Sequence, residues 1–438
     1  MRSIKQALAD MDFVTLGATL ALVVMGILSV YSSGVTAEGV LVSKEYIKQI
    51  VWAVSGLGLM AAVAFLDYKR IKDYSFIVYL VLVALLVYTR LFGKVVNGAR
   101  SWLGLVGDMG IQPSEFMKVA TILLLAQYLS ESEHESSLRR LGLSFAIILL
   151  PLGLILSQPD FGTALVFFPI FVFMIFVAGL DRRYIVFIIA FGSATSLLTV
   201  LPLWEKYMLR SPTSFLFVLY REPYPYILMA AALLVLGLSA WGWVSFKKGY
   251  YFWIAYVAIV LAGSLGASIL AHKVLKDYQV MRLIVFLDPS IDPRGSGWNI
   301  LQSITAIGSG GIAGKGFLQG TQSHYRYLPQ QSTDFIFSII AEEWGFLGGF
   351  AVFSLFFVIL RRCVLLLRTA KDRYAEYIVA GIMGMISFHF LVNAGMAMGI
   401  MPITGIPLFF LSYGGSSLWA VLVSVGLLLG ISSRRYRV

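Results

Sequence analysis

Long apolar runs separated by short polar connections make up most of the chain. A helix that spans a bilayer needs about 20 mostly apolar residues, and the runs lack the alternating polarity of barrel strands. The candidate spans lie at roughly 14–33, 49–67, 75–92, 113–130, 141–157, 162–180, 183–203, 225–244, 251–272, 336–360, 377–400 and 408–432. This pattern predicts an all-α polytopic membrane protein with about twelve transmembrane helices, in one integral membrane domain over residues 1–438.

The basic residues indicate an orientation for these spans. If the N-terminus is cytoplasmic, more than half of the 34 Lys and Arg residues fall in mostly short inside segments. The outside segments hold fewer basic residues, spread over longer stretches. Because short cytoplasmic loops are enriched in Lys and Arg, we expect both termini to be cytoplasmic.

Composition supports the membrane assignment and removes other classes. Hydrophobic residues make up 59% of the chain and charged residues 13%, against about 45–50% and about 25% in soluble domains. The net charge of +11 reflects orientation in the membrane, so we expect no nucleic-acid partner. A single cysteine, Cys363, excludes an internal disulfide framework and a cysteine-cluster metal site.

The connection over residues 273–335 is much longer than the others, and the topology places it outside the cytoplasm. Loops of this length are usually functional. It is rich in glycine, which exposes backbone N–H groups to an anionic ligand or simply permits sharp turns. Its candidate substrate-binding side chains are Gln302, Ser303, Lys315, Gln322 and Arg326.

Charged residues inside spans cost about 2.5–3.5 kcal/mol each on insertion scales, so each requires an explanation. Glu115 and Lys118 lie three residues apart at the start of a predicted helix, on one helical face. They form either a structural ion pair or one wall of a polar cavity at the outer face.

Further acids lie toward the same outer face. Asp160 occupies a Pro-Asp-Phe-Gly break that a turn alone would explain. Asp334 follows Ser332 and Thr333, either of which would cap the next helix, and it is either a first-turn acid or a general base at the rim of an external cleft. Glu342, next to Glu343, requires a polar path or a partner such as Lys118.

Other polar positions are less specific. In the segment from Asn97 to Trp102, Arg100 is either an interfacial anchor or a phosphate ligand. Ser412 lies in an irregular Pro- and Gly-rich opening of the last span, which is tolerated at membrane depth where it meets protein or a cavity. His389 is interpreted as a packed core residue, and the four histidines show no metal-ligand spacing.

Several segments together resemble the SEDS family of bacterial shape, elongation, division and sporulation proteins. The matching segments, in family order, read NGARSW, QPSEFMK, QPDFGT, DPRGSGWNILQS, YLPQQSTDFIFSIIAEEWG and PITGIPLFFLSYGGSS. The stretch GKGFLQGTQS is more similar to the elongation branch of the family than to the division branch. The resemblance covers most of the chain except roughly 204–272.

The resemblance implies a peptidoglycan glycosyltransferase of the bacterial cytoplasmic (inner) membrane, with its active site on the extracytoplasmic face. It would polymerise lipid II during cell elongation, with Asp334 as the catalytic general base and undecaprenyl pyrophosphate as leaving group. Glu115, Lys118 and Asp160 match family positions that line the cavity, and Arg100, Lys315 or Arg326 would hold pyrophosphate. The implied partners are a class B penicillin-binding protein that acts as transpeptidase, an undecaprenyl-linked glycan and membrane lipids. A divalent cation (Mg or Mn) is plausible, and its ligands are unknown.

The chain departs from the family pattern in two places. It adds an apparent helix pair within 204–272 to a ten-helix core, and an even insertion leaves Asp334 on the outer side. Ser332 stands where the family often has histidine. A lipid II flippase or other transporter stays open as an alternative, because buried charges also suit transport, and so does a non-catalytic scaffold for a transpeptidase.

Overall fold

A computed structural model describes residues 11–96, 99–106, 109–208, 216–219, 221–274, 282, 284–286, 288–292 and 295–434. The chain divides into two compact units. Unit 1 comprises Met1–Leu180 with Ile300–Val438, and unit 2 comprises Asp181–Asn299. The two units are described separately below.

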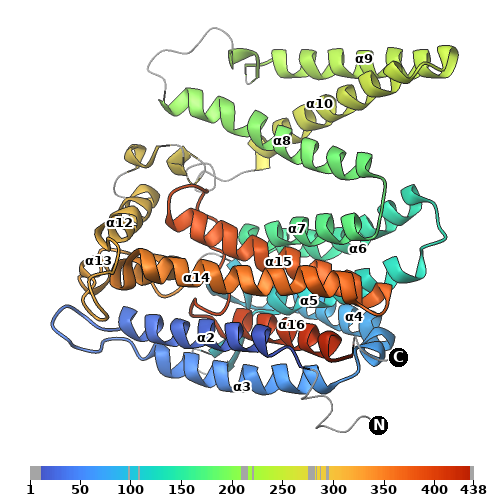
Figure 1. Cartoon of the computed structure of the whole chain (residues 1–438). Helices are drawn as coiled ribbons and strands as arrows, with labels where there is room; N and C mark the ends of the chain where they lie inside the picture. The colour runs from blue at the N-terminus through green and yellow to red at the C-terminus, as the bar shows by residue number, and fades with distance from the viewer. Residues whose placement is uncertain are drawn as a thin grey trace. The chain divides into compact units, whose positions relative to one another are not determined.

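Unit 1 is a helical bundle whose long helices run alongside one another (Figure 1). Its long helices are α2 (Phe13–Ser33), α3 (Glu45–Phe65), α4 (Tyr68–Phe92), α5 (Pro113–Glu131), α6 (Ser137–Ser157), α7 (Phe161–Val177), α14 (Ile336–Thr369), α15 (Arg373–Ala397) and α16 (Gly415–Arg434). The centre of the unit lies along α15 and α16, whose most apolar windows are 78% and 83% buried. Side chains on these two helices therefore face protein on nearly every side.

Side-chain caps and a proline mark the first turns of several helices. The Asp12 carboxylate accepts hydrogen bonds from the amides of Val14 and Thr15 and so caps α2. Pro113 occupies the first position of α5, where its missing N–H costs nothing. Asp372 caps α15 in the same way as Asp12 caps α2, by accepting from the amide of Ala375.

Each of the twelve predicted spans coincides with a helix. Ten of the helices in the described residues are long and apolar enough to cross a membrane, and α7 is a shorter apolar helix. The fold is that of an all-α polytopic membrane protein. The last helix begins at Gly415 rather than near residue 408 as expected, because residues 401–414 contain no regular helix.

One element was not predicted. Between α4 and α5 the chain forms a small antiparallel sheet of order β1-β2-β3, with strands Lys94–Val96, Ala99–Val106 and Met109–Ile111. Arg100 lies on β2, where it pairs with Val95.

The segment that precedes α14 is more structured than a plain loop. It contains α12 (Ser296–Ser309) and the one-turn helix α13 (Thr321–His324). The expected cap at Ser332 or Thr333 was wrong: α14 begins at Ile336, and its N-cap Phe335 makes no side-chain cap bond. Asp334 consequently precedes the helix, in a turn where its amide donates to the carbonyl of Gln330.

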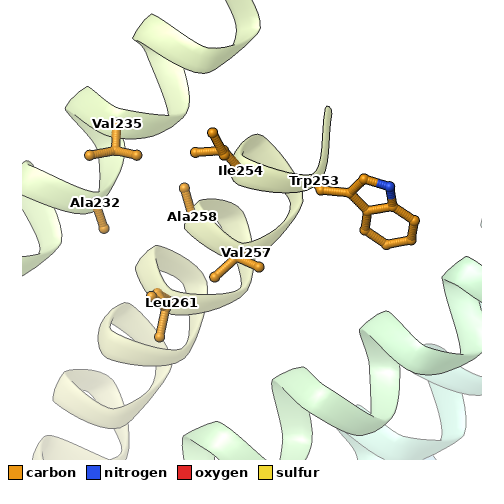
Figure 2. A pocket seen from close by; sticks show the side chains of 7 residues that line it. All are labelled: Ala232, Val235, Trp253, Ile254, Val257, Ala258 and Leu261. Carbon is orange, nitrogen blue, oxygen red and sulfur yellow. The ribbon is translucent and has the colours of Figure 1, made fainter. Parts of the chain in front are cut away.

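Unit 2 contains α8 (Arg182–Met208), the short helix η1 (Leu216–Leu219), α9 (Tyr224–Phe246), α10 (Gly249–Val274) and the short helix η2 (Pro289–Ile291). Helices α9 and α10 pair as a hairpin, and both are long and apolar enough to span a membrane. A hollow of about 420 Å³ on this hairpin is lined entirely by apolar side chains such as Val235, Val257 and Leu261 (Figure 2). It holds no group that could perform chemistry. Whether residues 204–272 are an insertion stays a prediction.

Candidate functional site

The irregular segment of residues 401–414 lies at the centre of the candidate site. Its proline and glycine content prevents a helix, so its backbone polar groups must find partners elsewhere. The side chain of Gln49 on α3 provides two of these contacts: its amide nitrogen donates to the Ser412 carbonyl (3.1 Å), and its oxygen accepts from the Gly414 amide (3.3 Å). Just after the segment, in the first turn of α16, Ser416 Oγ accepts from the backbone N–H of Gln112 at the start of α5 (2.9 Å). The segment is thus held in a fixed path between helices.

Three consecutive carbonyls just before α14 are each held by a different donor. The Tyr413 amide donates to the Ser332 carbonyl (2.8 Å), and the Ser412 hydroxyl donates to the Thr333 carbonyl (2.6 Å). The side-chain nitrogen of Asn393 on α15 donates to the Asp334 carbonyl (2.9 Å). The backbone that presents Asp334 is therefore attached to α15 and to the 401–414 segment.

The Asp334 side chain is partly exposed and lies beside Gly405. A β-carbon at Gly405 would lie 3.7 Å from Asp334 Oδ2. Gly405 also has φ +71°, a conformation that side-chain-bearing residues rarely adopt. The glycine both permits the local turn and leaves space next to the carboxylate.

Glu115 and Lys118 form a buried ion pair with a third member. Lys118 Nζ lies 2.9 Å from each carboxylate oxygen of Glu115 and 3.1 Å from His389 Nε2. His389 Nδ1 lies 2.9 Å from the Pro407 carbonyl, which can only accept. Nδ1 therefore carries the proton, and Nε2 accepts from Lys118. The ring also stacks on Phe409, with ring centroids 3.6 Å apart. His389 is therefore packed in the core as expected, and in addition both of its ring nitrogens make hydrogen bonds.

Asp160 has a local structural role and a contact with α5. Its carboxylate caps α7 by accepting from the Thr163 amide (3.1 Å), and it accepts from the Gln112 side chain (2.7 Å). Gly162, in the first turn of α7, lies so close to the 401–414 segment that a β-carbon there would be 2.6 Å from the Thr404 carbonyl oxygen. Thr404 and Gly405 thus lie between the start of α7 and Asp334.

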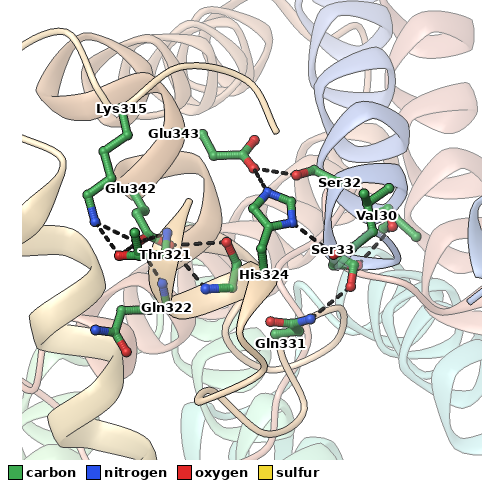
Figure 3. A network of polar contacts seen from close by, with 12 residues as sticks. Val30, Ser32, Ser33, Lys315, Thr321, Gln322, His324, Gln331, Glu342 and Glu343 are labelled. Atoms are coloured by element: carbon green, nitrogen blue, oxygen red, sulfur yellow. Dashed lines mark hydrogen bonds and ion pairs between the residues drawn. The ribbon is translucent and has the colours of Figure 1, made fainter. Parts of the chain in front are cut away.

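Glu342 is fully buried and pairs with Lys315 (Figure 3), whereas Lys118 pairs with Glu115. One of its carboxylate oxygens accepts from Lys315 Nζ (2.9 Å), and the carboxylate also accepts from three successive amides of α13. Those amides belong to Thr321, Gln322 and Ser323. The carboxylate therefore fastens the preceding loop onto α14.

The adjacent acid, Glu343, contacts a different part of the same loop (Figure 3). It accepts from His324 Nε2 (3.1 Å) and from the Ser32 hydroxyl of α2. His324 Nδ1 lies 2.8 Å from the Val35 carbonyl. Both ring nitrogens face acceptors, so the doubly protonated ring can donate to both of them, whereas the neutral ring can donate to only one. Its pKa is raised above the usual value because it donates to the Glu343 carboxylate, an effect larger than the lowering caused by burial.

The remaining predicted side chains lie in several places. Ser303 is buried and donates to the Ala397 carbonyl (2.6 Å), while Gln302 is partly exposed. Arg100 is exposed and donates to the Leu91 carbonyl (3.2 Å), and Arg326 is an exposed residue with φ +59°. Asn97 lies outside the described residues.

Asn393 and His324 were not singled out as site residues from the sequence. Asn393 lies inside an apolar run of α15, and a buried amide there is itself a signal, because polar groups in spans require partners. His324 carries no such signal, since its partners on α2 and α14 are remote in sequence.

The chain is similar to known proteins over nearly its whole length. The peptidoglycan glycosyltransferase RodA of Treponema pallidum is 49% identical, covering 98% of this chain and 99% of that protein. Stage V sporulation protein E of Bacillus subtilis is 33% identical, covering 96% of both chains. A chain in a structure described as coordinating polymerization and crosslinking in a peptidoglycan synthase complex is 26% identical, with a TM-score of 0.65 over 98% of this chain and 99% of that chain. Because the model for the FtsW/RodA/SpoVE cell cycle proteins also matches residues 13–227 and 225–437, the chain belongs to this family.

Proposed function

We propose that the protein is a peptidoglycan glycosyltransferase that polymerises lipid II into glycan strands during cell elongation. The observation that carries the proposal is the whole-length similarity to the Treponema pallidum glycosyltransferase. The site geometry supports it, because hydrogen bonds to the carbonyls of Ser332, Thr333 and Asp334 fix the backbone that carries the Asp334 side chain. A general base requires this kind of fixed placement.

In the proposed reaction, Asp334 accepts the proton of the 4-hydroxyl of the acceptor sugar. The freed oxygen attacks C1 of the donor sugar, and the bond from C1 to the pyrophosphate breaks. Undecaprenyl pyrophosphate leaves with the bonding electron pair, and the α configuration at C1 becomes a β-1,4 link. Asp334 is partly exposed, and the absence of a side chain at Gly405 leaves space beside its carboxylate.

The other predicted residues take supporting roles in this proposal. Glu115 and Lys118 stabilise the site from beneath, since their charges satisfy each other in a buried position. Glu342 and Lys315 hold the loop that precedes Asp334. Arg100 and Arg326 are exposed cations that would attract a pyrophosphate from solution.

The described residues contain no group of three or more His, Cys, Asp or Glu side chains that could hold a metal ion. A Mg²⁺ or Mn²⁺ ion that arrives with the pyrophosphate would need only one or two carboxylates from the protein, and the reaction above places no step on it.

The proposed location is the bacterial cytoplasmic membrane, with Asp334 on the extracytoplasmic face and a class B penicillin-binding protein as partner. Glycan strands require cross-linking, and the structural relative comes from a complex described as coordinating polymerization with crosslinking. The partner would supply the transpeptidase.

Purified protein with its transpeptidase partner tests the proposal directly. We expect lipid II to be polymerised, and Asp334→Asn to abolish polymerisation while the thermal unfolding temperature stays near that of the wild type. Polymerisation by the Asp334→Asn protein at the wild-type rate would contradict the role of Asp334. Movement of lipid II across vesicle membranes without polymer would instead identify a transporter.

A further inference from the structure

The Asn393 side chain lies fully buried on α15 and joins two segments that are remote in sequence. Its amide nitrogen donates to the Asp334 carbonyl (2.9 Å) and to the Ile406 carbonyl (2.8 Å). Both partners are carbonyl oxygens, so only the nitrogen end of the carboxamide can face them. The orientation of the side chain is therefore fixed by its partners.

Net stability does not account for an asparagine at this position. Two neutral hydrogen bonds contribute about 0.5–1.5 kcal/mol each. Asn393 Oδ1 is buried and has no hydrogen-bond partner, and an unsatisfied buried acceptor costs about 1–3 kcal/mol. The two effects nearly cancel, so the consequence of Asn393 is mainly geometric: it sets where the Asp334 backbone lies relative to Ile406.

The residue one helical turn earlier on α15 acts on the neighbouring carbonyl. His389 Nδ1 donates to the Pro407 carbonyl, and His389 Nε2 accepts from Lys118. Residues four apart lie on one face of a helix, so this face of α15 anchors two adjacent carbonyls of the 401–414 segment. The same face thereby connects the buried ion pair of Lys118 with the backbone of Asp334.

We propose that Asn393 is a positioning residue that fixes the Asp334 carboxylate for proton transfer. This inference rests on the proposed role of Asp334 as general base. The oxygen of a general base must lie about 2.6–3.2 Å from the oxygen whose proton it removes, and a displacement of 1 Å costs on the order of 10²-fold in rate. Asn393 acts only through Asp334 and does not touch the substrate.

Asn393→Leu, which keeps a similar side-chain volume without the amide, tests the inference. In the complex with its transpeptidase, kcat for lipid II polymerisation should fall by about 10- to 100-fold, while KM changes little. Because leucine leaves the Asp334 and Ile406 carbonyls without this donor, the unfolding temperature should also fall, and kcat is compared at a temperature at which both proteins are folded. The matched control is Ser424→Ala on α16, a fully buried polar side chain whose hydroxyl donates only to the Ala420 carbonyl of its own helix. The control should polymerise at the wild-type rate.

Hydrogen exchange provides a readout that does not depend on activity. The amides of Asp334 and Phe335 both donate to the Gln330 carbonyl, and release of the Asp334 carbonyl should loosen this turn. We expect faster exchange at these two amides in Asn393→Leu and no change in Ser424→Ala. If wild-type protein fails to polymerise lipid II, the proposed function falls, but this exchange measurement still decides whether Asn393 holds the turn.

Three results would overturn the inference. The first is unchanged kcat in Asn393→Leu, and the second is unchanged exchange at Asp334 and Phe335. The third is a loss of activity that follows the loss of folded protein, because that would assign Asn393 a purely structural role.

Discussion

Lys118 Nζ lies 2.9 Å from both carboxylate oxygens of Glu115, and the two side chains are 0% and 4% exposed. Because both side chains are buried, water cannot solvate either charge if its partner is removed. Removing one member of a buried pair costs about 3–5 kcal/mol because the other charge stays buried and unpaired. His389 Nε2 does not remove this cost, since a neutral ring nitrogen is a weaker acceptor for an ammonium than a carboxylate is.

Lys118→Met should accordingly lower the free energy of unfolding by about 3–5 kcal/mol. The double variant Glu115→Gln/Lys118→Met should lose less than the sum of the two single variants, since the second change removes the unpaired charge. Denaturant titration in detergent micelles measures all three. Lys72→Met is the control: its ion pair with Glu131 is 3.0 Å long but 29% and 56% exposed, and we expect a change below about 1 kcal/mol. Additive losses in the double variant would contradict the pairing.

Glu342→Gln should release the loop that carries α13. The carboxylate accepts from Lys315 Nζ and from three amides of α13, and a glutamine places an NH₂ group against some of these donors. We expect the free energy of unfolding to fall by about 3–5 kcal/mol and hydrogen exchange to become faster at residues 321–323. Glu38→Gln, at an exposed acid of the loop between α2 and α3, is the control and should leave exchange at 321–323 unchanged. Equal exchange in the two variants would refute the fastening role.

His324 predicts a pH dependence of stability. Its pKa is raised, first because Nε2 donates to Glu343 and further because Nδ1 faces the Val35 carbonyl, while burial acts in the opposite direction. A raised folded-state pKa means that the stabilisation is fully present below the unfolded value of about 6.5. It is lost as pH rises through the folded-state pKa.

The unfolding temperature of wild type should therefore exceed that of His324→Gln by more at about pH 6 than at about pH 9. Glutamine is the suitable replacement because it keeps one donor and does not titrate. His134→Gln, at an exposed histidine, should show the same small difference from wild type at both pH values. A constant gap between wild type and His324→Gln across this range would show that the ring stays neutral.

The helices could be predicted from sequence because length and hydrophobicity alone decide where a bilayer is crossed. The sheet of β1, β2 and β3 was missed because two of its strands have three residues each, too short to show a periodic pattern. The span predicted to begin at residue 336 coincides with the start of α14 at Ile336, but its expected N-cap was wrong. Capping chemistry at Ser332 and Thr333 pointed to a helix start, but tertiary donors bind the carbonyls of these two residues instead.

The site was predictable as far as single charged residues in apolar runs, because each of them is costly in a membrane. Lys118 and Glu342 were therefore recognised, and the i, i+3 pairing of Lys118 followed from local spacing. For Glu342 a polar path or a partner such as Lys118 was expected. A partner is present, but it is Lys315 together with α13 rather than Lys118, because only the folded chain brings them over the carboxylate. Asn393 has the same limitation: its two partners lie 59 and 13 residues away.

Gly162 offers a test of the path between α7 and Asp334 that changes no polar group. A β-carbon at Gly162 would lie 2.6 Å from the Thr404 carbonyl oxygen, which is backbone and cannot rotate away as a flexible side chain could. Gly162→Ala should therefore displace Thr404 and Gly405, and with them the space beside Asp334. We expect polymerisation to fall by at least about 10-fold, since a shift near 1 Å at the reacting group costs on the order of 10²-fold.

The comparison with Gly153→Ala separates this steric effect from helix propensity. Gly153 lies inside α6 with nothing within 4 Å of the added carbon, so the same substitution there should raise stability by up to about 1 kcal/mol and leave activity unchanged. If Gly162→Ala behaves like Gly153→Ala in both assays, the 401–414 segment is free to shift without affecting Asp334. In that case the fixed path described for this segment would have no part in catalysis.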